Sequence, residues 1–235
     1  MARNQLPDNS VAQRQLATAK AVMTLVPYFG GSAAEAFAAI LQPKIQKRRD
    51  EWFQAIADDL DKLIARVDQI ELQKLREDDR FVTALLNASQ SVLRDHSVEK
   101  REALKNAVLN VAAGIKLEDD LQQLFLNWID GLTPIHLRVL AFFQNPRSYG
   151  ERKEIQYPNW SMGVPAVVIE HTFKELLGRR EIYDQVIADL QQRGLLSKFD
   201  AHTTMTTEGM FASRTTEIGN TFLDFIASPI QNIST

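Results

Sequence analysis

The sequence predicts a mainly α-helical protein, with a helical bundle in residues 1–131 and a smaller domain of helices and one β-hairpin in residues 132–235. Three observations lead to this prediction. Apolar residues recur at three- and four-residue steps through the first half, which is the spacing of amphipathic helices. Proline, glycine and tyrosine become more frequent after Gly131. A hydrophobic fraction of 45% and a charged fraction of 24% are ordinary for a globular chain.

The first predicted helix runs from a Ser10 cap to Val26, and the segment Pro27–Gly31 stops it. The pattern Ser32-x-x-Glu35 is a capping box, so a second helix is expected to begin there. Pro43 should kink or end that helix, because proline removes an amide donor and crowds the preceding turn.

Four more helices complete the predicted bundle. An apolar stripe at helical spacing from Trp52 to Val67, with acids and cations between, predicts a long amphipathic helix. The polar break "LREDDR" separates it from the next helix. Ser97 and Gly114 are the expected caps of another, and "LEDDLQQLFLNWIDG" gives the last, which ends at Gly131.

The second domain is expected to open with a helix that has Thr133 as its N-cap and Pro134 in its first turn. Residues 145–165 predict a long loop, and "FKELLG" predicts a short helix. The segment "REIYDQVIADLQQRGLL" predicts a helix with Ile182, Val186 and other apolar residues inward. The threonine-rich residues 202–219, with central Gly209, predict a β-hairpin, and a short helix follows.

This order of elements is typical of a winged helix-turn-helix domain, a fold that often places its longer helix in the major groove of DNA. The expected nucleic-acid contacts are Arg179, Arg180, Gln185, Gln192, Lys198 and Arg214. Residues 132–235 hold ten Lys or Arg and eleven Asp or Glu. Because phosphate contacts need surplus cations, we disfavour DNA binding and keep a winged-helix transcriptional regulator as the alternative function.

A basic cluster of Lys44, Lys47, Arg48 and Arg49 directly follows the apolar corner Val26–Phe37. One interpretation is peripheral contact with an anionic membrane surface or a partner protein. The other, which we favour, is a buried helix pair followed by a solvated turn whose cations pair with Asp50 and Glu51.

No residue pattern predicts catalysis or a cofactor. The chain has no cysteine, so cysteine nucleophiles and cysteine-ligated metal centres are excluded. It has four histidines. His171 and Glu175 share a helical spacing but lack further ligands, and His136 on an apolar helix is expected to be a satisfied structural residue. Phosphate-binding, dinucleotide-binding, esterase and kinase motifs do not occur.

Three stretches carry a resemblance: "EALKNAVLNVA", "LTPIHLRVLAFF" and "TEIGNTFLDFI". With the apolar Pro-x-x-Gly-Gly corner and the "KRRDEW" segment, the chain resembles a loose group of prokaryotic proteins of unassigned function. The chain is also distantly similar to the abortive-infection alpha family over about half of its length, mainly in these three stretches. That family has no counterpart of "KRRDEW". The resemblance implies a bacterial source, a winged domain and a role in phage defence, and it supplies no catalytic residues.

We therefore predict a non-enzymatic bacterial protein that contacts protein partners or the inner membrane surface. The opening "MARNQLPDNS" has no apolar core, which predicts a cytoplasmic location, with a peripheral position at the inner membrane as a further expectation. Self-association is a second expectation, because the stripe from Trp52 to Val67 could pair with that of another copy.

Overall fold

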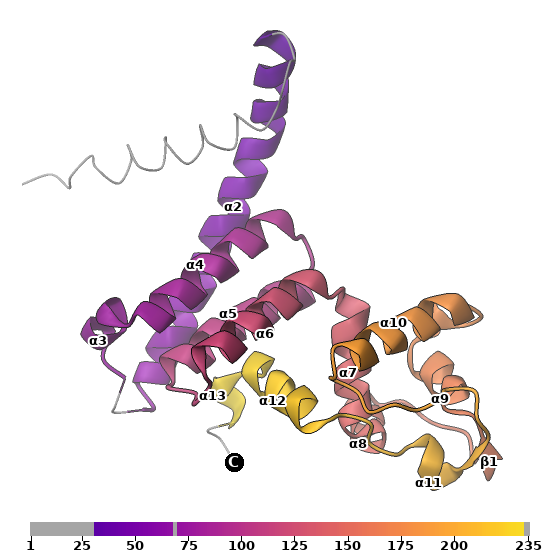
Figure 1. Cartoon of the computed structure of the whole chain (residues 1–235). Coiled ribbons are helices and arrows are strands. Elements are labelled where there is room, and N and C mark those ends of the chain that lie inside the picture. Colours follow the sequence, from indigo (N-terminus) through magenta and orange to yellow (C-terminus); the bar gives the residue numbers. More distant parts are fainter. Residues whose placement is uncertain (1–30, 68–69, 233–235) are drawn as a thin grey trace, which may run out of the picture. The chain divides into compact units, whose positions relative to one another are not determined.

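The computed structural model describes residues 31–67 and 70–232, with the backbone alone for 31–39, 231 and 232. The helix predicted over Ser10–Val26 lies outside the described residues, as do the side chains of the Ser32–Glu35 box. The described chain is mainly helical (Figure 1). It divides into two compact units between Arg48 and Arg49. No helix in the described residues is long and apolar enough to cross a bilayer.

Helix α2, Gly31–Ile64, begins near the predicted capping box and contains Pro43. Of the two effects predicted for Pro43, ending the helix is wrong, because α2 continues to Ile64, and a kink stays a prediction. Beyond Arg49, the predicted apolar stripe is buried by the chain itself at Trp52, Ile56, Leu60 and Leu63. Self-association therefore stays a prediction without support from this stripe.

The bundle within residues 49–131 is completed by α3 (Leu72–Glu77), α4 (Asp79–Arg94), α5 (Val98–Ala112) and α6 (Asp119–Gly131). The predicted caps are present. The Ser97 hydroxyl accepts a hydrogen bond from the Lys100 amide at 3.2 Å, and Gly114 follows α5 with a φ of +79°. Lys105 of α5 also forms an ion pair of 2.7 Å with Asp59 of α2.

After Gly131 come α7 (Pro134–Gln144), α8 (Pro146–Arg152), α9 (Pro165–Thr172), the 3₁₀ helix η1 (Lys174–Leu176) and α10 (Arg180–Gln192). The predicted loop over residues 145–165 is partly wrong, since α8 lies within it. The reason is local: the Asn145 side chain accepts from the Ser148 amide at 3.0 Å, and Pro146 occupies the first turn.

The β-structure is a small antiparallel pair of β1 (Met162–Gly163) with β2 (Met205–Thr206). The hairpin predicted over residues 202–219 is wrong, because β2 pairs with β1, which lies outside that range, and Gly209 lies in the short helix α11 (Thr207–Met210). The Thr206 side chain caps that helix through the Gly209 amide. One isolated antiparallel bridge joins Leu196 to Thr215. The predicted winged domain is thus not confirmed; what is present is a two-stranded sheet among helices.

Helices α12 (Glu217–Ile226) and α13 (Pro229–Asn232) end the described chain, and α12 packs on both α5 and α7 (Figure 1). Phe222 and Phe225 of α12 stand 5.3 and 5.6 Å from the ring of Phe125 in α6. Contacts of α12 with α5 therefore cross residues 131–132, where the sequence predicts a domain boundary. That boundary stays a prediction.

Gly219 in the first turn of α12 lies directly against the backbone of Leu195, and a Cβ at this position would overlap the Leu195 carbonyl oxygen. We expect Gly219→Ala to lower the free energy of unfolding by about 3 kcal/mol, because relieving the overlap requires the backbone at Gly219 or at Leu195 to move. Gly131→Ala is the matched control, because its Cβ would be 3.6 Å from the nearest atom, a flexible Arg193 nitrogen. Urea unfolding of the two variants checks this, and equal stabilities would contradict it.

Candidate functional site

The outward face of α10 is the surface where the sequence predicts nucleic-acid contact. Tyr183, Val186, Ile187 and Leu190 are buried and form the stripe that anchors the helix against α7. Ile182 was expected inward, but its exposed fraction is 38%. It lies about 100° around the helix from Tyr183, at the edge of that stripe.

Of the predicted contact residues, Arg179, Arg180, Gln185, Gln192 and Lys198 are exposed. Arg180 pairs with Asp184 at 3.2 Å, one turn further along the same helix. Arg214 has a structural role: its Nη2 donates to the Gly209 carbonyl at 2.9 Å, and its guanidinium lies 5.0 Å from the centre of the Phe199 ring. Nucleic-acid contact by these residues stays a prediction.

Two carboxylates of α10 are held by histidines from neighbouring segments. His202 Nε2 lies 2.7 Å from Asp184 Oδ1, and His136 Nε2 lies 3.3 Å from Asp189 Oδ2. The Gln185 amide also donates to Asp189, at 2.6 Å. Half-buried acidic oxygens therefore lie on both flanks of the exposed face of α10, which is a poor electrostatic match for phosphates.

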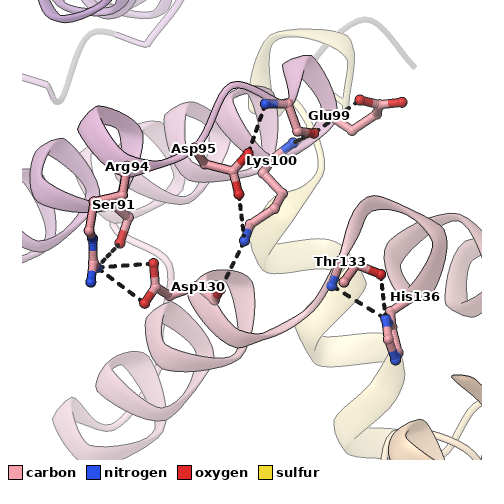
Figure 2. A network of polar contacts seen from close by, with 9 residues as sticks. Ser91, Arg94, Asp95, Glu99, Lys100, Asp130, Thr133 and His136 are labelled. Carbon is pink, nitrogen blue, oxygen red and sulfur yellow. Dashed lines mark hydrogen bonds and ion pairs between the residues drawn. The ribbon is translucent and has the colours of Figure 1, made fainter. Parts of the chain in front are cut away.

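His136 is buried at the start of α7, as part of a capping box with Thr133 (Figure 2). The Thr133 amide and hydroxyl lie 3.3 and 2.7 Å from His136 Nδ1. Because the backbone amide can only donate, Nδ1 is assigned as the acceptor and Nε2 carries the hydrogen that points to Asp189. Burial lowers the pKa of His136, and the nearby Asp189 carboxylate only partly offsets that effect.

The basic cluster lies on α2, and the exposure of its four side chains differs. Lys44 and Lys47 have exposed side chains, whereas Arg48 and Arg49 are half-buried. Arg49 forms the expected ion pair with Asp50, at 3.0 Å, but the expected solvated turn is wrong, because these residues lie within the continuous helix α2. Membrane or partner contact by the cluster stays a prediction.

His171 and Glu175 do not form a shared site. The His171 ring is bonded to the Gln156 carbonyl at 2.8 Å, and Glu175 forms an ion pair with Arg138 at 2.6 Å. Among residues 31–67 and 70–232, no group of three or more potential metal-binding His, Cys, Asp or Glu side chains comes together.

A polar cavity between α4 and α6 was not found from the sequence. Its volume is about 160 Å³, and Arg94 of α4 and Asp130 of α6 face each other on its wall (Figure 2). Arg94 Nη2 is 3.1 Å from both Asp130 carboxylate oxygens and 3.5 Å from the Ser91 hydroxyl. The signal that could have revealed it is a polar stripe at i, i+3, i+4 and i+7 on α4: Asn87, Gln90, Ser91 and Arg94.

A buried lysine fixes the carboxyl end of α6 beside this cavity (Figure 2). Lys100 Nζ donates to the Asp130 backbone carbonyl at 2.8 Å and pairs with the Asp95 carboxylate at 2.8 Å. Burial raises the pKa of Asp95, but hydrogen bonds from Lys100 and from the Ser97 amide outweigh it, so the pKa lies below the usual range. The backbone that carries Asp130 is thereby held in place.

The chain matches no family model, no curated protein and no solved structure. The resemblance to the abortive-infection alpha family stays a prediction from the three sequence stretches that carry it.

We expect His136 to make the stability of the protein depend on pH. The pKa of folded His136 lies below the 6.5 of an unperturbed histidine, so the unfolded chain takes up this proton first. This contribution is fully present above about pH 6.5 and is lost as the pH falls toward the folded pKa.

Urea unfolding of the wild type and of His136→Gln at about pH 7.5 and about pH 5.5 measures this effect. The difference in stability between the two pH values should be smaller in His136→Gln than in the wild type. An unchanged dependence in His136→Gln would contradict the account.

Proposed function

We propose that the protein acts by binding another protein through the outward face of α10. The observation that carries the proposal is the mixed character of this face. Leu177, just before the helix, is 65% exposed and Ile182 is 38% exposed, so two large apolar side chains flank Arg179 and Arg180. Exposed apolar groups among charges are typical of contact surfaces between proteins.

The electrostatics of α10 favour a protein partner over DNA. Arg180 is paired with Asp184, and Asp189 remains at the surface between His136 and Gln185. A DNA duplex would bring phosphates toward these acids, whereas a protein can supply an apolar surface together with matching donors and acceptors. The resemblance described above would place such a partner in phage defence.

Site-specific photocrosslinking in cells tests the proposal. A photoreactive residue replacing Gln185 should give a crosslinked protein adduct, and the same residue replacing the exposed Glu77 on α3 should not. The adduct at position 185 should disappear in a Leu177→Asp, Ile182→Asp background, because the apolar contact is lost.

DNA binding is the outcome that would replace this proposal. Fluorescence anisotropy with duplex DNA should show only weak binding at about 50 mM salt and none at about 200 mM. Sequence-selective binding that is lost in Arg179→Glu, Arg180→Glu would instead support a winged-helix regulator.

A further inference from the structure

The cavity between α4 and α6 has the composition of a binding site for a small polar molecule. Its floor is apolar, formed by the buried Leu104 and Leu126. Four amide side chains line its walls: Asn87, Gln90, Gln123 and Asn127. An apolar base with convergent polar groups is the usual design of a ligand pocket. Engineered cavities of about 150 Å³ hold a benzene-sized molecule, so about 160 Å³ accepts a ligand of roughly six to ten heavy atoms.

The charges of the cavity cancel. Arg94 and Asp130 form an ion pair on its wall, with side chains 67% and 42% exposed. The Arg94 guanidinium bonds Asp130 and Ser91 through Nη2, and once this pair opens, Nε and Nη2 point to the same side and can hold a ligand carboxylate by two parallel hydrogen bonds. Because the pair is exposed, a ligand can open it at little cost.

The amide groups form a row that is open at both ends. The Asn87 amide donates to Gln123 at 2.8 Å, and the Gln123 amide donates to Asn127 at 3.1 Å. In the part of the chain that the structure describes, this leaves the Asn87 oxygen as an acceptor and the Asn127 nitrogen as a donor without partners. The row therefore suits a group that both donates and accepts, such as a carboxamide or a hydroxyl.

We propose that this cavity binds a small α-amino acid with a polar side chain. Its carboxylate pairs with Arg94, its ammonium group pairs with Asp130, and its side chain meets the amide row. A simple anion would face the Asp130 carboxylate, and a simple cation would face the Arg94 guanidinium. A zwitterion gives each charge of the opened pair a new partner. The site is formed by other helices than the α10 face and does not depend on the function proposed for that face.

Isothermal titration calorimetry of the full chain with L-serine, L-asparagine and L-glutamine tests this proposal. At least one should bind saturably, with a Kd of about 1 mM or tighter. For L-glutamine, the analogues N-acetyl-L-glutamine and L-glutamine amide each lack one of the two charges. Each should bind at least about tenfold more weakly than the parent. The proposal is wrong if none of the three amino acids binds, or if the analogues bind as tightly as the amino acid.

Two charge-removing variants locate the site. Arg94→Gln and Asp130→Asn should each weaken binding at least about tenfold. Both residues are exposed, and the Asp130 carbonyl that Lys100 uses is unchanged, so far-UV circular dichroism should show a folded chain. Lys74→Gln removes the exposed ion pair with Glu71 on α3 and should bind like the wild type. Wild-type affinity in both cavity variants would overturn the assignment.

Discussion

The buried amide of Asn110 joins two parts of the chain that are 115 positions apart in sequence. Its Nδ2 lies 3.3, 2.9 and 2.8 Å from the carbonyl oxygens of Asp224, Phe225 and Ala227. The last carbonyls of a helix have no partner within it, and leaving them unpaired in a core is costly. Two side chains of α5 therefore satisfy the end of α12, because the Asn106 amide also donates to the Ile226 carbonyl at 3.0 Å. The rings of Phe222 and Phe225 on α12 also pack against the Phe125 ring of α6.

The docking of α12 on α5 also positions α10. The Thr216 side chain, which caps α12, donates to the Gly194 carbonyl at 2.5 Å, and the Thr216 amide donates to the Leu195 carbonyl at 3.1 Å. Gly194 and Leu195 directly follow α10. The carboxyl end of α10 is thus held by the start of α12. The helix is already ordered before a partner binds, so binding carries no entropy cost for ordering it.

The sequence predicts most of the helices, because their apolar spacing and caps are local signals. Ser97, Thr133 and Gly114 act where the pattern places them. The pairing of β1 with β2 could not be predicted, since strands of two residues carry no alternation. The paired residues are also far apart in sequence, by 44 positions for Met162 with Thr206 and by 42 for Gly163 with Met205. The α4–α6 cavity could not be predicted from the sequence for another reason. Each of its polar residues looks like ordinary helix surface until two helices bring the stripes together.

We expect the Asn110 contact to make residues on both sides of position 131 unfold together. Native-state hydrogen exchange in increasing denaturant tests it most directly. The slowest amides of α5, α10 and α12 should exchange through one opening with a common free energy. In Asn110→Ala, the free energies of all three should fall together. If α7 and α10 open at a much lower free energy while α5 is still protected, this expectation is wrong. The two parts would then unfold separately, as the predicted domain boundary at residues 131–132 requires.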